Sequence, residues 1–241
     1  MHPNRAPLAP FDAVSLDVGG VLIMPDRRVV GRALARAGVG HDPARFFDGH
    51  YRAMAEIDRR RARPEETSPY ARGFLRAVGT PDGQLDAGVA ALGSVLRQSA
   101  TWSQRIRGAV PAARRLAAAG LRLAVTSNSD GTVAERMRRR RVFQVGEGPG
   151  VPVEHVTDSG VLGRAKPDPV TFLTTAGALA LPPERICHVG DSGRFDADGA
   201  AAVGMVAVHV DPFGLCRGDH HHVDSLADFT GRALAARRLV R

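Results

Sequence analysis

The sequence predicts an α/β fold in which a doubly wound parallel sheet carries an all-helical insertion. After Trp102, short apolar runs alternate with helical patterns, which is the order expected of parallel strands covered by helices on both faces. A similar strand, Val14–Leu16, stands near the start, whereas the long segment between these regions shows helical patterns only. The chain is 44% hydrophobic, which is ample for a buried core. We therefore expect an α/β core of residues 1–24 and 100–241 and a helical module of residues 25–99.

The individual elements follow from local signals. The first strand ends at Asp17, where a Gly-Gly turn follows. Gly, Pro and Asp break the insertion into about four helices. In the second half, a helix with a proline near its start ends at Gly120. The remaining elements are expected in the order strand 121–129, helix 130–143, a strand near His155, helix 168–181, strand 185–192, helix 197–204 and a last strand 205–210.

The composition argues against several classes of protein. No apolar run is long enough to cross a bilayer, and the first residues, MHPNRAPLAP, lack the apolar region of a signal peptide. Cys187 and Cys216 are too few for a disulfide framework or a cysteine-based metal site. We therefore expect a soluble, cytoplasmic protein with no membrane partner.

The net charge of +8 invites a nucleic-acid interpretation, because basic surfaces attract phosphate backbones. However, Lys166 is the single lysine among 33 basic side chains, and the bias towards arginine, alanine and glycine indicates codon preference rather than a selected surface. No nucleic-acid-binding module is recognisable, so we expect no such partner. The lone lysine indicates a position that needs a compact ammonium group.

Polar side chains follow the ends of three predicted strands. Asp17, Ser127 and Asp191 each come directly after or at the end of an apolar strand, and Lys166 lies in a loop just before a helix. In open parallel sheets, ligands bind beyond the carboxyl ends of the strands. We therefore expect these four groups to converge on one edge of the sheet.

These residues belong to four motifs that occur in order. They are "LDVGGVL" with Asp17, "AVTSNSDG" with Ser127, "RAKPDP" with Lys166, and "HVGDSGRFDADGA" with Asp191 and Asp196. Taken singly, each residue could be an ordinary turn or cap residue. Together, and in these strand contexts, they resemble the haloacid dehalogenase (HAD) superfamily of hydrolases over most of the chain. The resemblance implies a Rossmann-like core with a helical C1-type cap inserted after the first motif.

The resemblance also implies a mechanism. Asp17 matches the nucleophile that attacks phosphorus and forms an aspartyl-phosphate, which water then hydrolyses. Ser127 matches the residue that hydrogen-bonds the phosphoryl oxygens, and Asn128 could add further donors. Lys166 matches the lysine that neutralises the nucleophile and the transferring phosphoryl group.

The same resemblance implies a magnesium ion. Its expected ligands are Asp17, the backbone carbonyl of Gly19 and Asp191, which are the hard oxygen donors that Mg²⁺ prefers. Asp196 matches the second late acid of the family, which orients Lys166 or a metal-bound water, and we count it among the residues of the metal site.

Gly19 departs from the family pattern, because phosphatases usually carry an aspartate there as general acid and base. Family dehalogenases place an aromatic residue at that position and do without magnesium, and mutases depend on the missing acid. Phosphonoacetaldehyde hydrolases of the family form a Schiff base with a lysine of the cap. The insertion here has no lysine, so this chemistry is excluded. We therefore expect a magnesium-dependent phosphatase, monomeric or homodimeric, that hydrolyses a small phosphorylated metabolite. The alternative is a weak or inactive homologue that binds a phosphorylated ligand or a protein partner.

Three further features have no assigned role. The run "RMRRRR", Arg136–Arg141, is interpreted as a solvated helix end. The run His220–His222 could suggest metal binding but is interpreted as incidental within a polar loop. His50 and Tyr51 lie in a helical pattern of the insertion and could face the active site or pack internally.

Overall fold

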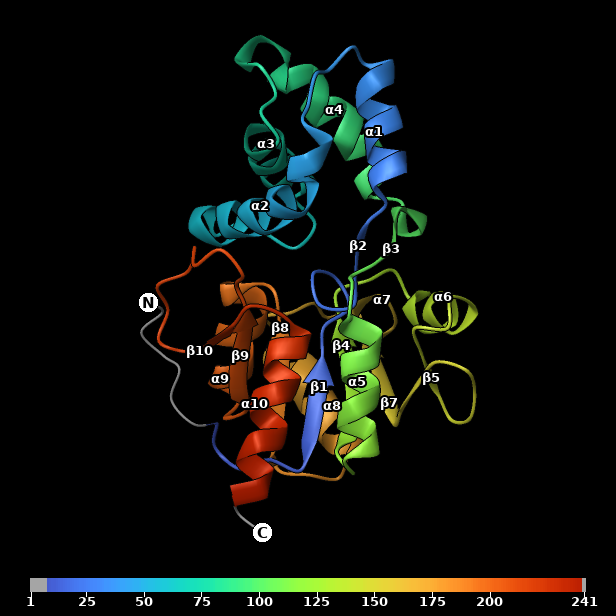
Figure 1. Ribbon diagram of the computed structural model, residues 1–241, viewed down its shortest axis with the longest axis vertical. Helices are drawn as coiled ribbons and strands as arrows, with labels where there is room; N and C mark the ends of the chain where they lie inside the picture. The colour runs from blue at the N-terminus through green and yellow to red at the C-terminus, as the bar shows by residue number, and fades with distance from the viewer. Residues whose placement is uncertain (1–7, 240–241) are drawn as a thin grey trace. The chain divides into compact units, whose positions relative to one another are not determined.

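The computed structural model describes residues 8–239, which divide into two compact units. The α/β unit comprises the chain up to Leu22 and the chain from Arg105 onward. The helical unit comprises Ile23–Gln104, so it enters the chain shortly after the first strand. Figure 1 shows the helices and strands of both units.

The α/β unit contains a six-stranded, fully parallel sheet of order β10-β9-β8-β1-β4-β7. The chain moves outward from β1 to β4 and β7, then starts again beside β1 with β8 and continues to β9 and β10. The fold is therefore a doubly wound, Rossmann-like α/β fold, as predicted. The strands are β1 (Ala13–Leu16), β4 (Arg122–Ser127), β7 (His155–Asp158), β8 (Ile186–Gly190), β9 (Val206–Val210) and β10 (His221–Val223).

Helices cover both faces of this sheet. α5 (Ala109–Ala118) and α10 (Leu226–Leu239) lie side by side on one face, whereas α8 (Pro169–Ala178) and α9 (Gly199–Ala202) lie on the other (Figure 1). On the second face Phe172 of α8 is fully buried among small and apolar strand residues, which are Ala13, Ala124, Ile186 and Ala207. The smaller elements of the unit are α6 (Val133–Arg139), α7 (Ser159–Leu162) and the paired strands β5 (Phe143–Val145) and β6 (Val151–Val153).

The helical unit consists of four α-helices and the short strands that connect it to the rest of the chain. Strand β2 (Ile23–Pro25) pairs with β3 (Trp102–Arg105) where the chain enters and leaves the unit. Asp26 caps α1 because its carboxylate accepts a hydrogen bond from the backbone N–H of Arg28. The helices are α1 (Arg27–Arg36), α2 (Phe46–Arg60), α3 (Thr67–Ala77) and α4 (Leu85–Leu96).

The C-terminal region differs from the prediction in one respect. The strand at Val206–Val210 is not the last, because His221–Val223 adds β10 in parallel to it, with His222 opposite His209. Two of the three histidines, His221 and His222, therefore lie in a strand, whereas His220 lies in the connection that precedes it. Three residues are too few to show an alternating pattern, and histidine counts as polar although His222 is buried here.

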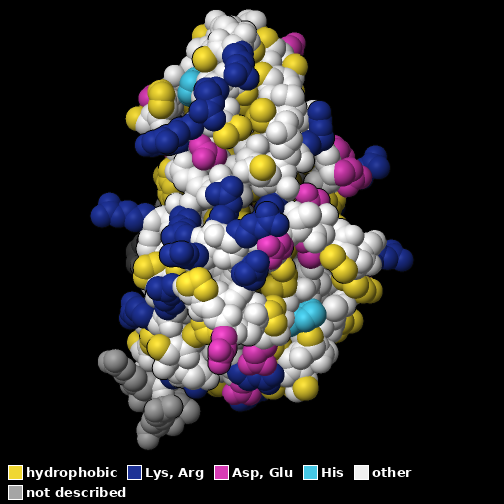
Figure 2. Space-filling view, turned by 90° about the vertical axis from the view of Figure 1, so that its right-hand side faces the viewer, with side chains coloured by type: hydrophobic (Ala, Val, Ile, Leu, Met, Phe, Trp, Pro, Cys, Tyr) yellow, Lys and Arg dark blue, Asp and Glu magenta, His cyan; other side chains and the backbone are white. Residues whose placement is uncertain are grey.

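Most of the arginine run behaves as a solvated helix end, although the side chain of Arg136 is only 18% exposed. Met137 is buried, whereas Arg138–Arg141 are exposed, and Arg138 and Arg139 both pair with Glu135. Figure 2 shows basic side chains distributed over the visible face, with acidic side chains among them. No helix within residues 8–239 is long and apolar enough to cross a membrane.

Candidate active site

The sheet brings the predicted strand-end residues to one edge. β1 lies between β8 and β4, and its last residue, Leu16, pairs with Val189 on one side and Val125 on the other. The N–H of Asp17 continues this pairing by donating to the carbonyl of Val189 at 2.9 Å. Because strand order reverses between β1 and β8, the edge occupied by Asp17 is the position where doubly wound sheets bind ligands.

Lys166 reaches this edge from the connection between α7 and α8. Its Nζ lies 2.8 Å from Asp17 Oδ1 and 2.5 Å from Asp196 Oδ1, and its side chain is only 3% exposed. The single lysine of the chain is thus a buried ammonium between two carboxylates, which agrees with the expectation that it marks a special position.

Asn128 fixes the backbone of that lysine. The N–H of Lys166 donates to Asn128 Oδ1 at 2.7 Å, and Asn128 Nδ2 donates to the Lys166 carbonyl at 3.1 Å. Because both ends of the amide serve this purpose, the side chain of Asn128 positions Lys166. The phosphate-binding role assigned to Asn128 from the sequence stays a prediction.

Two glycines make room for the late acids. Gly20 has φ +62°, and a Cβ there would lie 1.9 Å from Asp191 Oδ2. A Cβ on Gly190 would lie 2.1 Å from Asp196 Cγ. A side chain at either position would collide with a carboxylate, so both glycines are required for close approach, and Gly20 is required for the turn as well.

Asp196 lies on a π-helical turn, Gly193–Asp198, of the kind that recurs at functional sites. Its Oδ2 accepts a hydrogen bond from the N–H of Ser192 at 3.1 Å. Its Oδ1 contacts both Lys166 Nζ at 2.5 Å and His188 Nε2 at 3.0 Å. The carboxylate is therefore held at both oxygens, which fixes the ammonium that it contacts.

Sequence reasoning missed His188, a fully buried residue of β8. Besides Asp196, it contacts Ser15 Oγ through Nδ1 at 3.0 Å. Ser15 in turn lies 2.8 Å from Thr126 Oγ1, and this hydroxyl lies 2.7 Å from that of Thr175. A histidine inside the apolar strand "RICHVG" was a usable signal, because a polar side chain in a strand buried on both faces needs a partner.

The pKa values reflect this crowding. Burial, together with the nearby Asp196 and Asp191, raises the pKa of Asp17 to about 6, although Lys166 acts against the shift. Burial alone would lower the pKa of Lys166, but the carboxylates of Asp17 and Asp196 outweigh it and raise that pKa. Burial alone would raise the pKa of Asp196, but the Lys166 charge and the His188 hydrogen bond hold it well below its usual value.

The charges of the site do not balance. The carboxylates of Asp17, Asp191 and Asp196 are buried and offer oxygens within 4.8 Å of one another. With all three ionised and one ammonium among them, the cluster carries two excess negative charges. A divalent cation would neutralise this excess, and hard carboxylate oxygens are the ligands that Mg²⁺ prefers. The residues present therefore fit such an ion.

The remaining predicted residues are placed as follows. Ser127 ends β4 and is buried, and Gly19 is half-buried in the turn after Asp17. Their roles towards phosphate and metal stay predictions. His50 lies on α2, where its Nδ1 is 2.8 Å from Tyr70 Oη and its ring contacts Tyr51. These contacts support internal packing for that pair.

This fold and arrangement define a hydrolase of the haloacid dehalogenase-like class. A profile of the haloacid dehalogenase-like hydrolases matches residues 11–204, and the chain belongs to that family. The resemblance inferred from the four motifs is thereby confirmed.

Individual relatives add detail. Haloacid dehalogenase-like hydrolase domain-containing protein 3 from Mus musculus is 34% identical over 132 residues, which cover 54% of this chain and 49% of that protein. Its Bos taurus counterpart is 38% identical over 108 residues, covering 44% and 39%. The chain thus matches about half the length of these relatives or less.

Two solved structures share the fold. A HAD phosphatase from Thermococcus onnurineus superposes with a TM-score of 0.55 at 19% identity, covering 92% of this chain and 97% of that one. A 2-haloacid dehalogenase from Pseudomonas syringae gives a TM-score of 0.54 at 19% identity, covering 93% and 99%. Because a phosphatase and a dehalogenase match equally well, the fold alone does not select between the two reactions.

Proposed function

We propose that the protein is a magnesium-dependent phosphatase that hydrolyses a small phosphorylated metabolite through an aspartyl-phosphate at Asp17. The observation that carries this proposal is the unbalanced charge of the buried cluster, in which one ammonium contacts two of three neighbouring carboxylates. Such a cluster needs a divalent cation, and a phosphoryl group bound to that cation would then lie next to the nucleophile.

The same observation disfavours dehalogenation. A metal-independent attack on an anionic haloacid would bring another negative charge to a site that already carries two in excess. Each like-charge contact in a buried site is strongly unfavourable. The helical unit, which begins six residues after Asp17 in the sequence, resembles the inserted caps of the family, and this resemblance favours a small substrate.

In the first half of the reaction, each residue of the site has a separate role. A carboxylate oxygen of Asp17 attacks phosphorus, the bond from phosphorus to the ester oxygen breaks, and the alcohol departs with a proton from solvent or substrate. Lys166 neutralises charge on the nucleophile and on the phosphoryl oxygens, while Asp196 and His188 hold it in place. When bound, Mg²⁺ supplies electrostatic stabilisation of the phosphoryl oxygens.

The second half of the reaction restores the enzyme. Water attacks phosphorus of the aspartyl-phosphate, the acyl-phosphate bond breaks, and inorganic phosphate leaves with the Asp17 carboxylate regenerated. The hydroxyl of Ser127, at the end of β4, is assigned to donate to a phosphoryl oxygen in both steps.

The test is a panel of phosphorylated metabolites, with phosphate release measured in Mg²⁺ and in EDTA, beside halide release from 2-haloacids. The proposal predicts magnesium-dependent phosphate release and no halide release. Halide release without metal would replace the proposal by a dehalogenase. Binding of phosphorylated compounds without turnover would replace it by the inactive homologue.

A further inference from the structure

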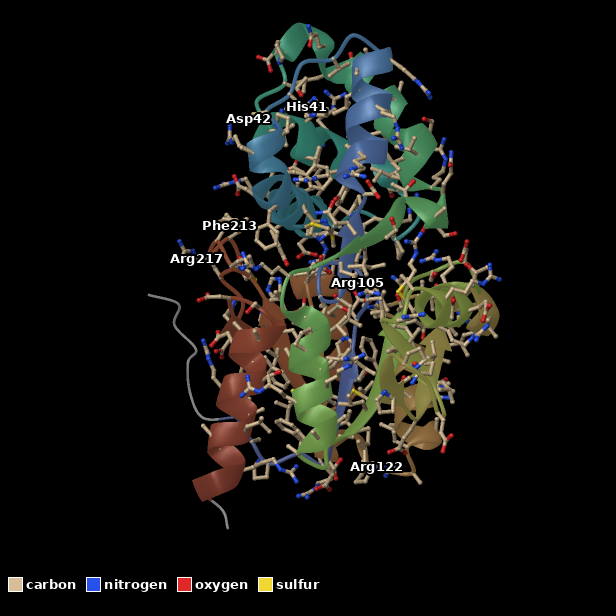
Figure 3. All side chains as sticks on the ribbon, turned by 45° about the vertical axis from the view of Figure 1, so that its right-hand side comes forward. His41, Asp42, Arg105, Arg122, Phe213 and Arg217 are labelled. Carbon is tan, nitrogen blue, oxygen red and sulfur yellow. The ribbon has the colours of Figure 1, made fainter. Side chains whose placement is uncertain are left out.

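A second cluster of ligand-type side chains lies in the α/β unit, between β9 and β10. The two strands place His222 opposite His209, and the connection between them carries Cys216 and His220. Figure 3 marks this connection by the labelled Phe213 and Arg217. Ring nitrogens of the three histidines lie within 4.8 Å of one another, and His209 and His222 are 5% and 2% exposed.

The distances within this cluster fit a tetrahedral metal. His220 Nε2 lies 3.2 Å from His209 Nδ1 and 3.5 Å from Cys216 Sγ. A tetrahedral zinc ion, with bonds of about 2.05 Å to nitrogen and about 2.3 Å to sulfur, separates two nitrogens by about 3.3 Å and a nitrogen and a sulfur by about 3.6 Å. Both observed separations agree with these edges, so three ligands could bind one ion with little movement.

The surrounding hydrogen bonds hold the ligands in a suitable state. His209 donates through Nε2 to the carbonyl of Asp191 at 3.1 Å, and His222 donates through Nε2 to the carbonyl of Gly218 at 3.2 Å. In His209 the Nδ1 atom then carries the lone pair, whereas His222 Nδ1 lies 3.6 Å from Asp211 Oδ2, so metal binding requires the His222 ring in its neutral form. Histidines that bind metals almost always donate their other N–H to a carbonyl or carboxylate in this way.

The loop is built around the thiol. Asp211 accepts hydrogen bonds from the N–H groups of Leu215 and Cys216, both at 2.9 Å, which fixes the position of the cysteine. The N–H of Gly218 lies 3.3 Å from Cys216 Sγ, where it would stabilise a thiolate. A Cβ on Gly218 would lie 2.4 Å from His220 Cε1, so a glycine is needed to admit the ring.

We propose that Cys216, His209, His220 and His222 form a tetrahedral site for a transition metal of the zinc class. Nitrogen and thiolate donors favour such ions over Mg²⁺, so this site differs in chemistry from the Asp17 cluster. The ion would bind Nδ1 of His209 and of His222, Nε2 of His220 and Sγ of Cys216. Through the His209 hydrogen bond it would also support the backbone of Asp191.

The experiment uses the full chain, stripped of metal and titrated with Co²⁺ in excess Mg²⁺, so that the carboxylate cluster is occupied. We expect one equivalent of Co²⁺ to bind with tetrahedral d–d bands and a thiolate-to-cobalt charge-transfer band, and Zn²⁺ to displace it. Because these readouts are spectroscopic, they do not depend on the phosphatase proposal.

Variants identify the ligands. Cys216→Ser should abolish the charge-transfer band, and His220→Ala should weaken Co²⁺ binding by about a hundredfold or more, since one of four ligands is lost. His221→Ala, which removes a neighbouring histidine outside the cluster, should bind as wild type. Circular dichroism checks that Cys216→Ser is folded, and this near-isosteric variant decides the matter should His220→Ala unfold. Wild-type spectra in Cys216→Ser, or no stoichiometric Co²⁺ binding by the wild type, would overturn the proposal and leave a hydrogen-bonded histidine cluster.

Discussion

The α/β unit holds two buried clusters of polar side chains that differ in how far their charges are balanced. Around Asp17, three carboxylates lie together with a single ammonium, which contacts two of them, so the cluster keeps an excess of negative charge. Between β9 and β10, imidazoles and a thiol contact one another and backbone carbonyls, and a single carboxylate, that of Asp211, faces His222 Nδ1. An excess of buried charge lowers the stability of the folded protein, so its presence in the first cluster indicates a catalytic role. The second cluster does not require a catalytic role to account for it.

The sharpest test of this contrast is Asp17→Asn. Asparagine keeps the shape of the side chain but cannot form an acyl-phosphate, so we expect phosphate release to fall by at least about a thousandfold. Asp12→Asn is the matched control, because Asp12 lies at the other end of β1 in an exposed pair with Arg185. Retention of more than about a tenth of the activity, less than about 1.4 kcal/mol, would contradict the covalent mechanism.

Gly19 predicts a strong dependence on the leaving group. It cannot donate a proton, and general acid catalysis typically contributes about 10²–10⁴-fold. We expect kcat/KM to fall steeply across phosphate esters of similar size as the pKa of the departing alcohol rises, with acyl, aryl and anomeric sugar phosphates preferred. A flat profile would mean that another group donates the proton.

The excess charge also makes Lys166 sensitive to a conservative change. A planar guanidinium does not fit the buried space between Asp17 and Asp196, so Lys166→Arg should lower kcat by about a hundredfold. Arg164→Lys, two residues earlier and exposed, is the matched control. Near-wild-type turnover in Lys166→Arg would show that the position needs only a positive charge.

The contribution of His188 is expected to appear in the free energy of unfolding. His188→Ala removes the partner of Asp196 Oδ1 on one side and of Ser15 Oγ on the other. Buried polar groups that lose a partner, with the cavity left by the ring, should cost about 2–4 kcal/mol of unfolding free energy. His155→Ala, in the edge strand β7, should cost less in the same urea titration. Equal costs for the two variants would count against the buried network.

The last prediction concerns pH. The pKa of Asp17 is about 6 in the folded protein against 3.8 ordinarily, so folding favours the protonated form. The resulting penalty is absent below pH 4, grows as pH rises to about 6, and is complete above it. Without metal, Asp17→Asn should therefore raise the unfolding free energy at pH 8 by an amount on the order of 3 kcal/mol, and not at pH 4. An unchanged or lowered stability at pH 8, measured in EDTA, would show that the Asp17 charge is already balanced.

Much of the site could be predicted because it follows from strand ends. Asp17, Ser127 and Asp191 end or follow neighbouring strands, and a parallel sheet brings such ends together. What could not be predicted depends on register between distant segments. The His209 and His222 pairing requires the three-residue strand β10, and the His188 and Ser15 contact requires knowing that β8 lies beside β1. The partner of Asn128 was likewise hidden, since it is a backbone group in a loop.

The position of β1 has a consequence for the order in which the protein is made. Ser15 of β1 contacts His188 of β8, its neighbour on one side, across 173 residues of chain. During synthesis at about 5–20 residues per second, β1 therefore waits on the order of ten seconds or more for β8 to emerge from the ribosome. The helical unit ends at Gln104, so all of its residues emerge before β8 does and it can fold in that interval. Assembly of the nucleophile with its lysine and late acids is thus among the last events of folding. A nascent chain that stops before β8 therefore has no complete active site.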